Sequence, residues 1–177
     1  MYKTLVVLPL FIFLQSFSQK EIIANKRITS ITLDGKLDEI EWGNAKWNTG
    51  FSQMRPFPGQ APSIRDYFNP NLDVFAIFID TYKDHQNGFM FALTSRGVQL
   101  DAKIFNSEFN DLFNLVWRSK TEINEEGWFA EVKIPYSALR FPKSEIQNWN
   151  INFGRQISRF REEVTWMPVN PDLENYL

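Results

Sequence analysis

The sequence contains no cysteine and only one histidine, His85. The chain can therefore form no disulfide, and its stability has to come from its core. Zinc and copper sites rely on imidazole and thiolate ligands, so oxygen-ligated ions such as calcium are the only metals that we expect. His85 stands alone in a polar loop, which is typical of a surface residue, and we expect no cofactor.

The sequence also lacks a hydrophobic run long enough to cross a membrane, which takes about 20 apolar residues. The N-terminal apolar run covers only residues 5–14, with Lys3 before it and the small-residue pattern 16–18 after it. This is the pattern of a secretory signal peptide. We expect residues 1–18 to be cleaved and residues 19–177 to form one exported domain, which is periplasmic, outer-membrane-associated or extracellular.

Neither sign of charge is in large excess. Lys and Arg number 19 against 21 Asp and Glu, a net charge of −2, which becomes −3 when Lys3 leaves with the leader. Because phosphate recognition depends on a basic surface, we expect no nucleic-acid partner.

Aromatic residues, by contrast, are abundant: they make up 16 % of the chain, with 17 Phe and 6 Trp. This aromatic content has two possible explanations. Either the rings fill the core of a β-sandwich, or some of them face outward and stack on the apolar faces of sugar rings.

Short strands separated by turn signals predict an all-β fold, an antiparallel β-sandwich resembling a jelly roll. The segment 72–81 is apolar on both alternating faces and should be a central strand. The segment 128–134 alternates, with one face buried and the face of Glu131 mostly wet. We expect the other strands at residues 28–33, 88–94, 98–105, 113–121, 149–159 and 164–167, helical turns at 38–42 and 136–139, and a long loop over 52–71.

Three segments carry a family resemblance: D-G-K-L-D-E-I-E-W at 34–42, the strand at 73–80 that ends I-F-I-D, and G-W-F-A-E-V-K-I-P-Y at 127–136. Together they resemble the family 9 carbohydrate-binding modules. The resemblance implies non-catalytic binding of a polysaccharide or oligosaccharide, accessory to polysaccharide catabolism.

Segments 80–82, 97–99, 139–141 and 152–155 are also similar to large exported bacterial proteins in which such a domain precedes an outer-membrane barrel. This similarity implies a second hypothesis, a structural or interaction domain with a barrel partner and without sugar binding.

The chain departs from the family pattern in three places. Relatives carry two further strands before the segment 65–66, so the domain looks internally deleted, and they continue beyond Leu177, so it looks C-terminally truncated. The tryptophan and the glutamate that contact sugar in relatives match Pro70 and Ala76 here. Any sugar site in this chain would therefore have to be rebuilt from other residues.

The candidate ligand-binding residues are Trp166, Arg155, Trp117 and Glu131. Trp166, near the loop-rich C-terminus, is either a stacking platform or a packed rim residue, whereas Trp117 shares a strand face with Leu115, which favours burial. Arg155 lies on an apolar strand face and should be paired, with Glu131, Glu162 or Glu163, either locking the fold or lining a polar groove.

Catalysis and calcium binding have weaker signals. A glycosidase needs two carboxylates held about 5 to 9.5 Å apart, and neither Glu125-Glu126, in a turn, nor Glu162-Glu163, on opposite faces, is suited. We therefore expect that the chain is not an enzyme. The oxygen-rich sets Asp80, Asp84, Asn87 and Asn69, Asn71, Asp73 are candidate calcium ligands.

Overall fold

The computed structural model describes residues 20–55, 58–59, 73–106, 108–172 and 175–177. The predicted leader lies outside these ranges, as do the junction at 63–66, Asn69, Pro70 and Asn71.

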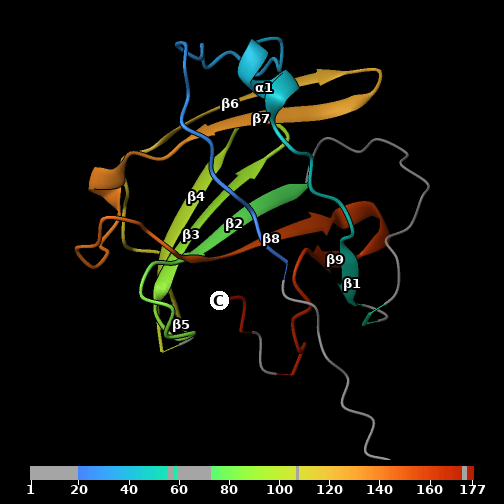
Figure 1. Ribbon diagram of the computed structural model, residues 1–177. Helices are drawn as coiled ribbons and strands as arrows, with labels where there is room; N and C mark the ends of the chain where they lie inside the picture. The colour runs from blue at the N-terminus through green and yellow to red at the C-terminus, as the bar shows by residue number, and fades with distance from the viewer. Residues whose placement is uncertain (1–19, 56–57, 60–72, 107, 173–174) are drawn as a thin grey trace, which may run out of the picture.

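The described chain is built of short strands with three brief helical segments (Figure 1). The strands are β1 Ser52–Arg55, β2 Val74–Asp80, β3 Gly88–Thr94, β4 Gln99–Phe105, β5 Glu108–Asn110, β6 Arg118–Asn124, β7 Gly127–Lys133, β8 Asn150–Ile157 and β9 Glu162–Thr165. The helical segments are α1 Ile40–Asn44, η1 Tyr136–Ala138 and η2 Ser158–Phe160. Within the described ranges, no helix is long and apolar enough to span a membrane.

The strands form two antiparallel sheets. Seven of them make one sheet in the order β1-β9-β8-β2-β3-β4-β5, and β6 and β7 pair as a separate hairpin. Figure 1 shows this hairpin lying across one end of the large sheet. The all-β prediction is therefore confirmed, with an arrangement consistent with a sandwich in which the second layer is much the smaller one.

The main core lies between the two sheets. Alternate side chains of β2 and β3 point to the same face, which places Ile79, Phe89, Phe91 and Leu93 under the hairpin. Trp117 and Leu139 complete this cluster, and apolar side chains of β7 pack against it. The opposite face of β2 carries Ala76 and Phe78, which join a second cluster. The prediction that the segment 72–81 is a central strand covered on both faces is confirmed.

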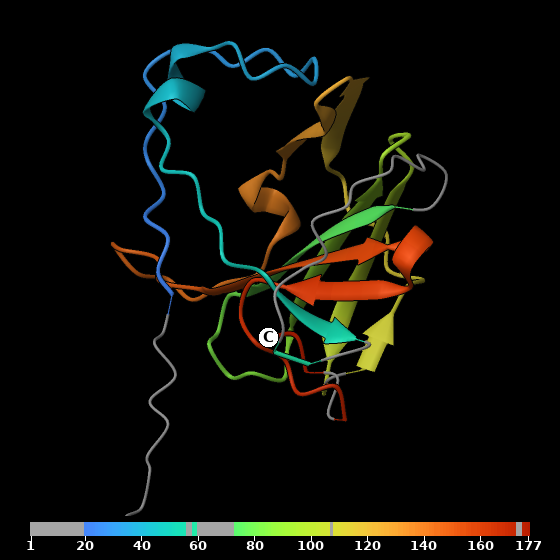
Figure 2. The same cartoon turned by 90° about the vertical axis from the view of Figure 1, so that its right-hand side faces the viewer.

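The predicted strand at 28–33 does not form. Carboxylates of the next segment accept the N–H groups that a strand partner would take: Glu41 accepts from the backbone of Thr29, and Glu39 accepts from the backbone of Thr32. These local bonds compete with sheet pairing. Figure 2 shows residues 20–50 as an extended segment along one side of the molecule, with α1 two residues later than the predicted turn.

Other boundaries also differ from the predictions: the strand expected at 164–167 is β9, two residues earlier, and the strand expected at 149–159 ends at Ile157. Part of the predicted loop at 52–71 is strand β1, because Ser52 and Gln53 pair with the edge offered by β9. The predicted strand at 113–121 begins only at Arg118. Before that point Asp101 satisfies the polar groups instead, accepting from the Leu115 N–H at 2.7 Å and from the Trp117 Nε1 at 3.2 Å.

Candidate functional site

Trp166 lies in the interior, with 2 % of its surface exposed. Its ring meets Phe153 edge to face at 5.7 Å between centroids, and the Lys20 ammonium lies 5.3 Å from its centroid. Burial lowers the pKa of Lys20, whose Nζ also donates to the Trp166 carbonyl. Of the two alternatives for this residue, its surroundings match the packed one.

Trp117 is buried in the main core. Its ring makes an edge-to-face contact with Phe91 at 5.5 Å between centroids, and its Nε1 donates to Asp101. A buried indole needs a partner for its N–H, and Asp101 provides it. The expected burial of Trp117 is confirmed.

Glu131 is buried as well, with 1 % of its surface exposed, so the prediction of a wet face of β7 is wrong at this residue, although Lys133 on the same face is exposed. Its Oε2 accepts from the backbone N–H groups of Asp34 and Gly35 at 2.9 and 2.8 Å, and its Oε1 accepts from Trp42 Nε1 at 3.2 Å. The N-terminal segment therefore covers this face. Glu131 and the D-G-x-L-D-E-x-x-W segment therefore form one structural contact, and we call these three hydrogen bonds the latch.

Arg155 is paired, as predicted, but with a different partner. Its guanidinium contacts Asp73 at 3.3 Å, and the same carboxylate accepts from the Ser158 backbone N–H. Glu163, one of the expected partners, pairs with Arg55 at 3.8 Å instead. The Arg155 pair therefore ties the start of β2 to the end of β8.

The calcium candidates organise the loop between β2 and β3. Asp80 is fully buried and accepts from the backbone N–H groups of Tyr82, Lys83 and His85 and from the Asn150 side chain. Asp73, of the other set, pairs with Arg155. In the described part of the chain, no cluster of three or more His, Asp or Glu side chains is placed to hold a metal. Calcium binding stays a prediction.

A cavity of about 860 Å³ lies on the core face of the large sheet, and none of the four candidate residues lines it. Phe89, Lys103 and Phe105 rise from β3 and β4, while η1 and the segment 113–116 stand opposite. On this face Phe91 is fully buried beneath the hairpin, whereas Phe105 is 59 % exposed. The core face of the sheet therefore includes both buried residues on β3 and exposed residues on β4.

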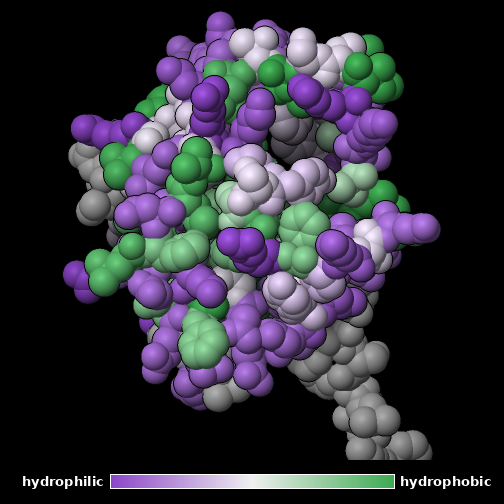
Figure 3. Space-filling view, turned by 90° about the vertical axis from the view of Figure 1, so that its left-hand side faces the viewer, coloured by the Kyte–Doolittle hydropathy of each residue, from purple (hydrophilic) through white to green (hydrophobic). Residues whose placement is uncertain are grey.

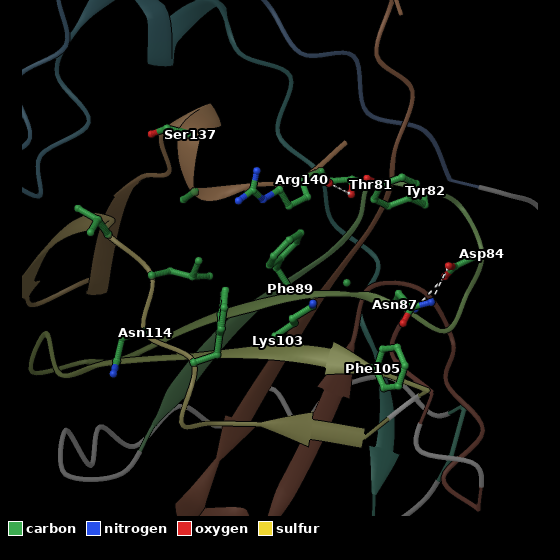
Figure 4. Close-up of a pocket in the computed structure, with 15 residues that line it drawn as sticks. Thr81, Tyr82, Asp84, Asn87, Phe89, Lys103, Phe105, Asn114, Ser137 and Arg140 are labelled. Carbon is green, nitrogen blue, oxygen red and sulfur yellow. Dashed lines mark hydrogen bonds between the residues drawn. The ribbon is translucent and has the colours of Figure 1, made fainter. Parts of the chain in front are cut away.

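The cavity combines open aromatic rings with polar side chains. Tyr82, Phe105 and Phe113 are 54, 59 and 40 % exposed. Figure 4 shows Phe89 and Lys103 on the sheet, Arg140 across from them, and Asp84 with Asn87 at one end. Rings beside a few polar groups are typical of small-molecule and sugar sites.

The charged residues that line the cavity make different contacts with their neighbours. The Asn87 side chain donates to Asp84 at 2.7 Å, and this bond lowers the pKa of Asp84 below its ordinary value. The Lys103 ammonium lies 5.9 Å from the centroid of Phe113. The backbone carbonyl of Arg140 accepts from the Thr81 hydroxyl, which attaches the chain at Arg140 to the end of β2.

Sequence reasoning missed most of these residues, although Asp84 and Asn87 were singled out for calcium. Strand alternation places Lys103 and Phe105 on one face of residues 98–105, but it does not tell which part of that face stays uncovered. Figure 3 shows the side of the molecule that carries η1 and the loop between β2 and β3, where apolar groups are interrupted by polar ones.

No known protein-family model matches the chain. No curated protein matches it. No solved structure matches it either.

Proposed function

We propose that this chain is a non-catalytic carbohydrate-binding domain and that its site is the cavity lined by Tyr82, Phe105, Phe113, Lys103 and Arg140. The observation that carries the proposal is the exposure of three aromatic rings around one hollow that also presents polar side chains. The apolar C–H faces of a sugar stack on such rings, and its hydroxyl groups bind the polar side chains. The resemblance to family 9 carbohydrate-binding modules supports the same function.

The carboxylate content of the cavity lining favours binding over bond cleavage. Among the described residues that line it, Asp84 is the one carboxylate. Hydrolysis of a glycosidic bond by the usual mechanisms needs a pair, one acting as acid and the other as base or nucleophile. Asp84 also accepts hydrogen bonds from the Asn87 side chain and from the backbone N–H groups of Gln86 and Asn87 in its own loop.

The proposed setting follows from the N-terminal sequence. A domain exported by the leader at 1–18 would meet polysaccharides in the periplasm, at the outer membrane or outside the cell. There it would hold a substrate close to enzymes that degrade it. Dissociation constants between millimolar and micromolar are expected for such a small, open site.

Affinity electrophoresis against plant, algal and microbial polysaccharides tests the proposal. We expect at least one polysaccharide to retard the protein, and Tyr82→Ala and Phe105→Ala each to weaken binding about tenfold through the loss of a stacking ring. Trp47→Ala is the matched control, because Trp47 is exposed and does not line the cavity. Absence of retardation by every polysaccharide would overturn the proposal.

A second candidate, the interaction domain of an outer-membrane assembly, is favoured by one observation. Leu112 and Val116 are 87 and 82 % exposed, on the segment that also forms one wall of the cavity. A patch of exposed apolar side chains is typical of a protein contact, and we propose that these two belong to one. Co-purification with a membrane barrel, lost in Leu112→Ser and Val116→Ser but kept in Tyr82→Ala, would support this candidate; a partnerless protein retarded by glycans would contradict it.

A further inference from the structure

We infer that the cavity selects an acidic glycan, one whose sugars carry a carboxylate or a sulfate ester, and that Arg140 and Lys103 bind this anionic group. This inference rests on the proposed function and adds the class of ligand. Its basis is the balance of charges that line the cavity, two cations against the single carboxylate of Asp84.

The carboxylate is already engaged by its own loop. Asp84 accepts from the backbone N–H groups of Gln86 and Asn87 and from the Asn87 side chain, at 2.9, 2.7 and 2.7 Å. These bonds hold its charge at the end of the cavity. Asp84 therefore has hydrogen-bond partners without a cation, and among the described residues it forms no ion pair with Arg140 or Lys103.

The cations, by contrast, are directed to the cavity without an acidic partner. Within the described residues, the ion pairs join other side chains, and both Arg140 and Lys103 are exposed. Lys103 rests against the ring of Phe113, which restrains its ammonium without neutralising it. The guanidinium of Arg140 offers the fork of donors that binds a carboxylate or sulfate through two parallel bonds.

The net charge of the protein does not explain a preference for acidic glycans, so the preference has to come from the cavity itself. With a net charge of −2, the chain as a whole does not attract polyanions. Binding of an acidic polymer therefore has to come from a particular patch of positive charge. The cavity presents two cations, Lys103 on the sheet and Arg140 across from it, beside rings that accept the apolar faces of the same sugars (Figure 4).

Matched pairs of polymers test the inference by titration calorimetry at low ionic strength. Polygalacturonate is compared with its methyl ester, and dextran sulfate with dextran. We expect at least one acidic polymer to bind about tenfold tighter than its neutral counterpart, the gain of one hydrogen bond to a charged group. Added salt should reduce the difference by screening.

Substitutions test whether the preference for acidic polymers comes from the two cations of the cavity. We expect Arg140→Gln and Lys103→Gln each to lose about tenfold in affinity for the acidic polymer, and thereby to reduce the difference in affinity between the acidic polymer and its neutral counterpart. Arg96→Gln and Lys120→Gln are the controls, since both residues are exposed and neither lines the cavity. Equal loss in the controls would show unspecific attraction and overturn the inference.

The remaining outcomes separate this inference from the function on which it rests. If acidic and neutral members of both pairs bind equally, or if only neutral polymers bind, the acidic class is wrong and carbohydrate binding stands. If no acidic or neutral polysaccharide binds at all, both are wrong.

Discussion

The carboxylate of Glu131 accepts a hydrogen bond from the backbone N–H of Gly35 at 2.8 Å, across 96 positions of the sequence. This bond and those from Asp34 and Trp42 attach the N-terminal segment to the outer face of β7. A buried carboxylate is tolerated because several donors surround it. Two motifs of the sequence are thus the two halves of one contact.

Replacing Glu131 by alanine should release this segment. The change leaves the N–H groups of Asp34 and Gly35 without an acceptor, and we expect a loss of about 3 kcal/mol in the free energy of unfolding. Urea denaturation measures it, and limited proteolysis should cut residues 20–50 faster. The control is Glu125→Ala in the exposed β6–β7 turn, for which a change within about 0.5 kcal/mol is expected. Equal effects of the two variants would contradict the latch.

Gly35 itself should resist substitution. Its φ is +92°, a value that side chains disfavour, and an added Cβ would lie 3.1 Å from the backbone of both Thr121 and Glu122. We expect Gly35→Ala to cost about 1–3 kcal/mol in unfolding free energy. Gly43→Ala is the control, because Gly43 lies in α1 with open space around it, and alanine there should stabilise by about 0.5–1 kcal/mol. A neutral Gly35→Ala variant would show that the two segments do not meet.

The loop that bears Asp84 should respond to acid. Because the Asn87 side chain lowers the pKa of Asp84, the carboxylate stays charged below its ordinary value of 3.8. The order that it gives the loop is fully present above pH 3.8 and is lost as the pH falls through the lowered pKa. An NMR titration of the Asp84 carboxyl carbon should therefore have a midpoint below 3.8, and Asn87→Ala should raise it. An unchanged midpoint in the variant would contradict the assigned cause.

The ion pair of Arg155 and Asp73 should be worth more than that of Arg55 and Glu163. The first pair is 3.3 Å apart and only 31 and 12 % exposed at its side chains, whereas the second is 3.8 Å apart and 43 and 34 % exposed. Solvent screening weakens both, so we expect coupling energies of about 1 kcal/mol for the first and below about 0.5 kcal/mol for the second. Double-mutant cycles to alanine measure these values; the reverse order would be inconsistent with the burial of Asp73.

Local sequence signals predicted the strands of the large sheet better than they predicted the N-terminal segment beside it. The bounds of β3 follow from the strand-like apolar run of residues 88–94 between two turn signals, and all seven residues are strand in the structure. The strand expected at 28–33 failed because the carboxylates of Glu39 and Glu41 take the backbone donors that pairing needs. Propensity does not include such competition from a neighbouring segment.

The site was harder to predict than the fold. The alternation of β7 makes Glu131 look wet, since nothing in residues 128–134 tells that a distant segment will cover it. In the same way, Phe105 and Lys103 share a face with the core residues of β3, yet both are exposed in the structure. Both cases concern which element covers a face, a property of the whole chain.

The most direct test of the account is a two-dimensional amide NMR titration of the protein with oligogalacturonate. The account predicts that the shifted resonances gather around Tyr82, Lys103, Phe105, Phe113 and Arg140, and that those around Trp47 and Arg96 stay in place. Shifts centred on another face of the molecule, or no shifts with this ligand or with neutral oligosaccharides, would contradict it.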